Sequence, residues 1–112
     1  MLLLLALLVG CGGDDPRLVV SAASSMTGAL TACSRDFDGA DVRLSFAGSD
    51  ELAAQIRQGA RVDVFAAANT RLPDDLAADE LLDKPVEFAT NQFVLAVPSD
   101  SEIDSIDDLT AG

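Results

Sequence analysis

Serine residues follow two predicted strands at the points where helices are expected to begin. The first turn, Ala22–Thr27 (AASSMT), contains Ser24 and Ser25, and the second turn, Ala47–Glu51 (AGSDE), contains Ser49. A serine at such a position can cap the helix through its hydroxyl group. Its hydroxyl and the neighbouring backbone N–H groups can also bind an anion, which the helix dipole favours. Each turn alone is compatible with a simple cap, whereas two such turns at one sheet edge favour a shared anion site.

The elements that must position these turns alternate along the chain. Strands are expected at 17–22, 41–47, 62–68 and 88–97, helices at 26–37, 49–58 and 72–82, and the start of another helix at 105–110. This alternation predicts an α/β fold with a mainly parallel central sheet. Ligands of such sheets bind at the carboxyl ends of the strands. The turns Ala22–Thr27, Ala47–Glu51 and Ala67–Thr70 are therefore the places to look for function.

Charge and length narrow the classes of partner. The chain has 112 residues, a net charge of −12 and no histidine. Its length suits one small domain. Nucleic-acid binding depends on clustered Lys and Arg, so the acidity argues against it. A small anion remains possible, because local backbone N–H groups can hold it whatever the net charge.

The N-terminal segment resembles an export signal. The apolar run Leu2–Val9 is far shorter than the ~20 residues that span a bilayer, and it suits the apolar region of a secretion signal. The following Gly10-Cys11 resembles a lipobox, which predicts a signal peptide over 1–10, lipid attachment at Cys11 and a tether over 11–16. The alternative is a buried strand with an ordinary cysteine. The other cysteine, Cys33, is expected to be a small buried thiol on the first helix.

The residues disfavour an enzyme of the doubly wound class and a metal site. The chain lacks histidine, and it contains no G-x-G-x-x-G or Walker motif after a strand. Its carboxylates are scattered, which is a poor arrangement for metal binding. Asp63, on the third predicted strand, is expected to face a strand end or solvent rather than to act as a base. No cofactor is expected.

Three stretches of the sequence resemble the periplasmic molybdate-binding proteins of ABC transporters. They are VVSAASSMTGAL at 19–30, SFAGSDELAAQIRQGARVDVFAAAN at 45–69, and FATNQFVLAVP at 88–98. The resemblance runs almost continuously from Leu18 to Pro98. It implies a type II periplasmic-binding-protein fold, whose two lobes close like a hinge on the ligand. By position, Ser25 and Ser49 correspond to the family's two oxyanion-binding serines.

The resemblance also implies a location and partners. A protein of this kind is extracytoplasmic, here anchored to the membrane through lipid, and it delivers molybdate or tungstate to the permease and ATPase of an ABC importer. Residues 17–98 would form lobe I, a three-layer α/β unit, and 99–112 would form the hinge exit and the start of lobe II. Most of lobe II, with its further N–H donors and often a tyrosine, has no counterpart in this chain, which contains no tyrosine.

The chemistry of the ligand agrees with serines and amides but does not select one anion. Molybdate and tungstate carry no proton near neutral pH, so their site should contain donors only. Sulfate meets the same description. Phosphate keeps a proton that Asp50 could accept, although Asp50 is also expected simply to face water beside the helix N-terminus. With half of the site, the chain is expected to bind oxyanion weakly or not at all. The remaining alternative is a decayed lipoprotein that binds nothing.

Overall fold

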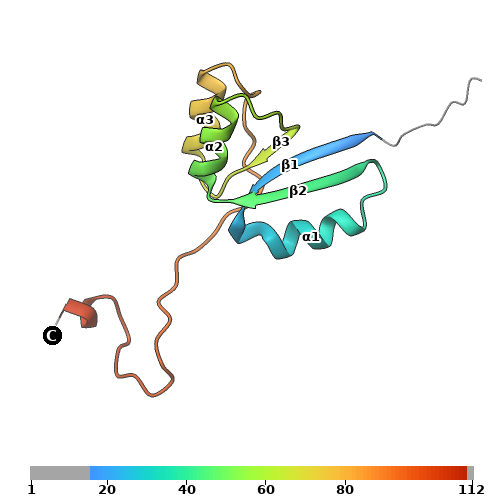
Figure 1. The fold of residues 1–112 in the computed structure, drawn as a ribbon. Coiled ribbons are helices and arrows are strands. Elements are labelled where there is room, and N and C mark those ends of the chain that lie inside the picture. Colours follow the sequence, from blue (N-terminus) through green and yellow to red (C-terminus); the bar gives the residue numbers. More distant parts are fainter. Residues whose placement is uncertain (1–15, 111–112) are drawn as a thin grey trace, which may run out of the picture.

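The computed structural model describes residues 16–110 and contains three strands and three α-helices in alternation (Figure 1). The elements in order are β1 (Arg17–Ala23), the 3-10 helix η1 (Ser24–Met26), α1 (Thr27–Arg35), β2 (Asp41–Ala47), α2 (Ser49–Arg57), β3 (Val64–Ala66), α3 (Arg71–Ala78) and the 3-10 helix η2 (Asp107–Thr110). The α/β fold class is confirmed. The third strand and third helix are shorter than expected from the sequence.

The three strands form one parallel sheet in the order β2-β1-β3. In the central strand, Ala22 is the register partner of Phe46 on one side and of Ala66 on the other. Helix α1 covers one face of the sheet, and α2 and α3 cover the opposite face (Figure 1). The three-layer arrangement follows from the parallel strands, because each helical crossover must return along one face of the sheet.

Alternation along β1 points its apolar residues toward both faces of the sheet. Val20 and Ala22 are buried on the α1 side, where Leu30 and Phe46 pack against their cluster. The side chain of Ala23, which is also buried, points to the opposite face, because successive strand residues alternate. The carboxyl-terminal half of β1 is therefore enclosed on both faces, which fixes the place where its following turn begins.

The second core lies between α2 and α3. It consists of Ala53, Ile56, Leu72 and Leu76, with Phe65 of β3 packed against it. The side chain of Leu76 is fully buried. These positions lie three or four residues apart on each helix, which is the spacing of one helical face. This packing holds α2 and α3 side by side above β3.

Helix α2 ends in a left-handed residue, as its sequence suggests. Gly59 has a φ of +97°, its N–H donates to the carbonyl of Ile56, and the N–H of Ala60 donates to the carbonyl of Gln55. These two bonds form a Schellman motif, in which glycine at the left-handed position avoids a steric cost.

Helix α3 ends in the same motif without a glycine. Glu80 has a φ of +58°, its N–H donates to the carbonyl of Ala77, and the N–H of Leu81 donates to the carbonyl of Leu76. A side chain disfavours the left-handed conformation, so the motif at α3 carries strain that the motif at α2 does not.

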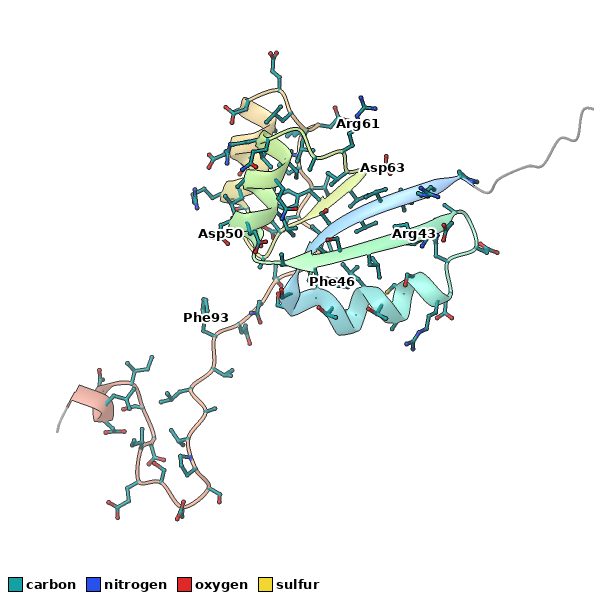
Figure 2. All side chains as sticks on the ribbon, in the orientation of Figure 1. Arg43, Phe46, Asp50, Arg61, Asp63 and Phe93 are labelled. Carbon is teal, nitrogen blue, oxygen red and sulfur yellow. The ribbon has the colours of Figure 1, made fainter. Side chains whose placement is uncertain are left out.

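The strand expected at Phe88–Val97 is wrong for this structure. Residues 86–97 lead away from the sheet and belong to no strand, and Phe93 is fully exposed (Figures 1 and 2). The residue types favour an extended backbone, but a strand also needs a neighbour whose N–H and carbonyl groups pair with its own. This segment takes neither the edge of β2 nor that of β3, so nothing pairs with it.

The expectation of a buried Cys33 is also wrong, because the thiol is exposed. Met26 and Leu30 of the first helical stretch pack toward the sheet, and Thr31 and Ser34 are half-buried. Part of the sheet-facing side of α1 is thus formed by Thr31 and Ser34 rather than by Cys33.

Within residues 16–110, no helix has both the length and the apolar character that crossing a bilayer requires. The predicted signal peptide, the tether as far as Asp15 and the lipid-attachment residue Cys11 lie outside the described residues.

Candidate anion site

The two serines identified from the sequence occupy equivalent places in adjacent turns. Ala23 and Ala47 are register partners at the ends of β1 and β2. Ser25 and Ser49 each follow two residues later. Because the strands are parallel, both turns leave the same edge of the sheet (Figure 1). The turn after β3 leaves there too, so all three turns meet at the carboxyl ends of the strands.

Neither serine caps its helix. The N-cap residue of η1 is Ala23, that of α2 is Gly48, and neither helix start has a side-chain cap hydrogen bond. In the first turn, the Thr27 hydroxyl donates instead to the carbonyl of Ser24 over 2.7 Å. The simpler role that the sequence leaves open, a serine cap, is therefore not the one these hydroxyls have.

Ser49 connects the second turn to the third. The backbone N–H of Ala68 donates to Ser49 Oγ over 3.0 Å, and the Ser49 side chain is half-buried. A hydroxyl that accepts one hydrogen bond still has its own proton to donate. The bond to Ala68 therefore fixes the position of Ser49 Oγ and leaves its O–H available for an acceptor such as an oxyanion.

The Ser25 hydroxyl is exposed and has no hydrogen-bond partner among residues 16–110. It lies in η1, whose short turn carries the backbone N–H groups of the first helix start toward the same edge of the sheet. An exposed hydroxyl without a protein partner can turn to suit a ligand. Ser25 thus offers a second donor without the fixed geometry of Ser49.

Backbone donors accompany Ser49 at the start of α2. The first intrahelical bond runs from the N–H of Leu52 to the carbonyl of Gly48, over 3.0 Å. The N–H groups of the three preceding residues, Ser49 to Glu51, have no acceptor within the helix. They carry the positive end of the helix dipole, which favours a negative ligand.

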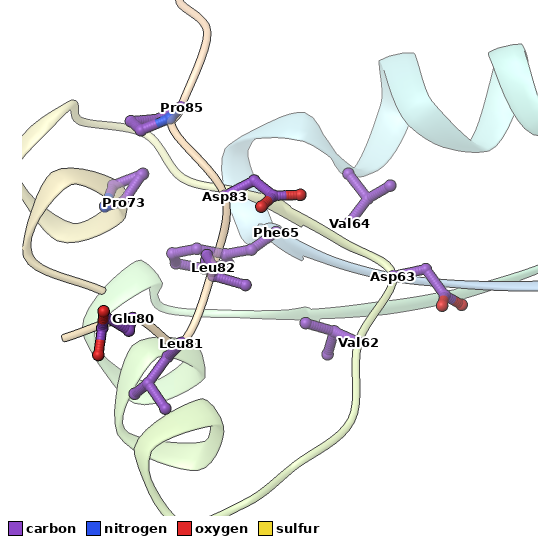
Figure 3. Close-up of a pocket in the computed structure, with 10 residues that line it drawn as sticks. All are labelled: Val62, Asp63, Val64, Phe65, Pro73, Glu80, Leu81, Leu82, Asp83 and Pro85. Atoms are coloured by element: carbon purple, nitrogen blue, oxygen red, sulfur yellow. The ribbon is translucent and has the colours of Figure 1, made fainter. Parts of the chain in front are cut away.

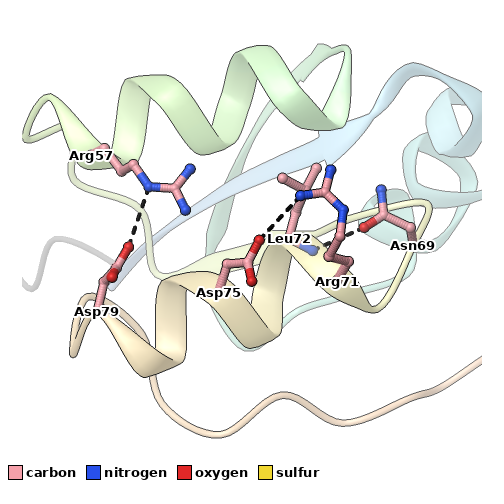
Figure 4. Close-up of polar contacts among 6 residues, drawn as sticks. All are labelled: Arg57, Asn69, Arg71, Leu72, Asp75 and Asp79. Carbon is pink, nitrogen blue, oxygen red and sulfur yellow. Dashed lines mark hydrogen bonds and ion pairs between the residues drawn. The ribbon is translucent and has the colours of Figure 1, made fainter.

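Two residues of the third turn escaped the sequence analysis. Ala68 supplies the N–H that holds Ser49. Asn69 Oδ1 accepts the N–H of Leu72 over 2.9 Å and so satisfies one free N–H group at the start of α3 (Figure 4). Asparagine before a helix is a recognisable cap signal, so Asn69 could have been found. The role of Ala68 depends on tertiary contact and leaves no signal in its residue type.

Charged side chains near this edge are mostly acidic or neutralised. Asp50 and Glu51 lie in the first turn of α2. Arg71, the first residue of α3, pairs with Asp75 over 3.2 Å, and Arg57 pairs with Asp79 over 3.4 Å at the far ends of the same helices (Figure 4). All these ion-pair side chains are largely exposed, so each pair contributes little to stability. Hydrogen-bond donors, rather than ionic attraction, would have to bind an anion here.

A pocket among the described residues lies elsewhere. It has a volume of about 480 Å³ and lies along β3 and the segment after α3, where Phe65, Leu81 and Leu82 line it (Figure 3). Three carboxylates, Asp63, Glu80 and Asp83, also line it, whereas Ser25 and Ser49 do not. Carboxylates repel anions and supply acceptors rather than donors. The anion site is therefore placed at the serine turns, which supply hydrogen-bond donors, rather than in this pocket.

Asp63 has a structural role. Its carboxylate accepts the N–H of Val19 over 2.7 Å, and its own N–H donates to the carbonyl of Val19 over 2.9 Å. These bonds extend the pairing of β1 and β3 by one residue. The structure thus agrees with the expectation that Asp63 lies at a strand end. Among residues 16–110, no three potential metal-ligating side chains gather into a metal site.

Comparison with known proteins gives a consistent result. Residues 18–112 match the family model of the bacterial extracellular solute-binding proteins. The chain is 39% identical to the molybdate-binding protein ModA of Mycobacterium tuberculosis, over 96% of this chain and 49% of the relative. It is 34% identical to ModA of Haemophilus influenzae, over 81% of this chain and 38% of the relative. It thus spans about half the length of the M. tuberculosis relative.

A solved structure supports the fold. The substrate-binding domain of a putative molybdenum ABC transporter from Clostridium difficile superposes with a TM-score of 0.51 and 29% sequence identity, over 57% of this chain and 30% of that one. The resemblance found in the sequence is confirmed. The family consists of binding proteins rather than enzymes, in agreement with the lack of catalytic motifs. The chain belongs to the bacterial extracellular solute-binding protein family.

Proposed function

We propose that this chain forms the oxyanion-contacting half of an extracytoplasmic binding protein that captures molybdate for an ABC importer. The observation that carries the proposal is the placement of Ser25 and Ser49 in equivalent turns, with Ser49 Oγ held by the N–H of Ala68. The relatives named above bind molybdate according to their names, which supports the choice of ligand.

The donors of this edge suit a fully deprotonated oxyanion. Every oxygen of molybdate is an acceptor, and the two hydroxyls and their neighbouring backbone N–H groups can each donate a hydrogen bond to it. Each hydrogen bond to a charged group contributes about 1.5–3 kcal/mol. Four such bonds would contribute about 6–12 kcal/mol before the costs of desolvation and ordering. Tungstate has the same shape and charge, so this site treats it as molybdate, and sulfate differs only in size.

The affinity of the chain alone should be low. It spans about half the length of the M. tuberculosis relative, so in a longer protein further donors would come from elsewhere. We expect binding that amide chemical shifts detect at millimolar molybdate and that calorimetry does not detect at micromolar concentrations. Micromolar affinity would contradict the view that these turns form only part of a site.

The test removes both hydroxyls. In a longer protein that has the further donors, Ser25→Ala together with Ser49→Ala should lower molybdate affinity at least about a hundredfold, equal to ~2.7 kcal/mol. In this chain alone, the double change should abolish the weak binding. Ser34→Ala is the control, because the Ser34 hydroxyl bonds to the carbonyl of Thr31 within α1, far from the turns. If the double variant bound like the original protein, the site assignment would be wrong. If no anion bound to any of them, the decayed, non-binding alternative would stand.

Membrane attachment is a separate part of the proposal. The lipobox-like string before Cys11 supports cleavage after residue 10, acylation of the thiol and retention at the outer face of the membrane. Labelled fatty acid should be incorporated in bacterial cells by the protein and by its Cys33→Ser variant, but not by Cys11→Ser. Equal labelling of both variants would exclude Cys11 as the site. The permease and ATPase of the importer are the partners that follow.

A further inference from the structure

The carboxylate of Asp50 occupies the place of a missing cap at the start of α2. The N-cap residue Gly48 has no side chain, and a Cβ built on it would lie 2.7 Å from Asp50 Oδ1. An N-cap side chain normally reaches from this position toward the free N–H groups of the first turn. The Asp50 carboxylate therefore lies close to the N-cap residue. Figure 2 shows Asp50 at the start of α2, the helix whose first N–H groups would bind the anion.

The carboxylate is not engaged by any other group there. It forms no hydrogen bond or ion pair with residues 16–110, and the helix start has no side-chain cap bond. Its negative charge thus lies near the proposed oxyanion site, and no ion pair with residues 16–110 offsets it. The neighbouring Glu51 differs, because Gln55 Nε2 donates to Glu51 Oε1 over 3.4 Å and directs that carboxylate along the helix.

We propose that Asp50 sets the charge preference of the anion site by weakening the binding of dianions more than that of monoanions. The inference rests on the proposed function, since it concerns the same donors. Coulomb repulsion between the carboxylate and a bound anion is proportional to the anion's charge. A dianion therefore loses twice as much binding free energy as a monoanion of the same shape.

The experiment compares the original protein with Asp50→Asn and Glu51→Gln, which remove the same charge from adjacent residues. Each protein is titrated with molybdate, a tetrahedral dianion, and with perrhenate, a tetrahedral monoanion, and the amide shifts of Ser25, Ser49 and Ala68 are followed. At low salt, Asp50→Asn should raise molybdate affinity about tenfold and perrhenate affinity about threefold. Glu51→Gln should change either affinity less than twofold. The gains should shrink as salt is added.

The outcomes separate this inference from the function on which it rests. Equal gains for the two anions, or equal gains in the two variants, would overturn the role of Asp50 while leaving the site intact. A loss of affinity in Asp50→Asn would overturn it as well, because it would show that the carboxylate supports the site. If none of the three proteins responded to molybdate, the proposed function would fail and the inference with it.

Discussion

The backbone N–H of Ala68 donates a hydrogen bond to Ser49 Oγ over 3.0 Å and so joins the turns after β2 and β3. Ser25, in the turn after β1, has no such bond among the described residues. The two serines thus occupy equivalent places in their turns but differ in their contribution to stability.

This difference can be measured by unfolding. Ser49→Ala removes the acceptor of the Ala68 N–H and should lower the free energy of unfolding by about 1 kcal/mol. Ser25→Ala breaks no bond within the described chain and should change it by less than about 0.5 kcal/mol. Urea unfolding followed by circular dichroism provides both values. Equal losses in the two variants would contradict the hydrogen-bond assignment.

The two Schellman motifs predict opposite effects of substitution. Gly59→Ala places a side chain at a φ of +97° and should destabilise the protein by about 1 kcal/mol. Glu80→Gly relieves the left-handed glutamate at α3 and should stabilise it by up to about 1 kcal/mol, less the added entropy of glycine in the unfolded chain. Thermal unfolding of both variants is the measurement. A destabilised Glu80→Gly variant would show that the Glu80 side chain contributes more than its backbone strain costs.

A pH-dependent turn lies near the C-terminal end of the described chain. Asp108 Oδ2 accepts the N–H groups of Asp104 and Ser105 and the Ser105 hydroxyl, over 2.8–2.9 Å. The bond from the Asp104 backbone, followed by those from Ser105, lowers the pKa of Asp108 below its ordinary value of 3.8. The stabilising effect on the turn is fully present above that ordinary value and is lost as the pH falls through the lowered pKa.

Nuclear magnetic resonance can follow this loss. The amide signals of Asp104 and Ser105 should shift together with a midpoint below pH 3.8, and Asp108→Asn should remove this shared transition. Asp100→Asn is the control, because Asp100 accepts none of these bonds. A midpoint above 3.8 would contradict the bonding pattern.

The loss of a large apolar side chain should lower stability in the core between α2 and α3 far more than in the exposed segment after α3. Leu76 is fully buried between α2 and α3, whereas Phe93 is fully exposed. Leu76→Ala should cost about 2–5 kcal/mol through lost burial and a cavity, and can unfold so small a domain. Phe93→Ser should change stability by less than about 0.5 kcal/mol and raise solubility. Similar losses would show that Phe93 packs against the folded part in solution.

Local sequence pattern predicted the parts of the fold that local contacts determine. The strand and helix alternation and the parallel sheet follow from periodicity and turn chemistry. The equivalence of Ser25 and Ser49 follows from the same alternation once register is known.

The errors concern features that depend on distant partners. Residues 88–97 have the composition of a strand but no neighbour to pair with. The burial of Cys33 depends on how α1 is rotated about its own axis on the sheet. The residue types of the helix alone did not determine that rotation. The Ala68–Ser49 bond joins a featureless alanine to a residue 19 positions away. Only tertiary structure could reveal it.

The three-residue strand β3 is fastened just outside both of its ends. The Asp63–Val19 pair holds the residue before the strand, and the Ala68–Ser49 bond holds the second residue after it. A strand of this length has few ladder bonds of its own, so these two flanking contacts supply a large share of the bonds that hold it in place. An anion that immobilised Ser49 would strengthen the contact after β3. Loss of the Asp63 side chain would remove a contact before β3, at the opposite end of the strand.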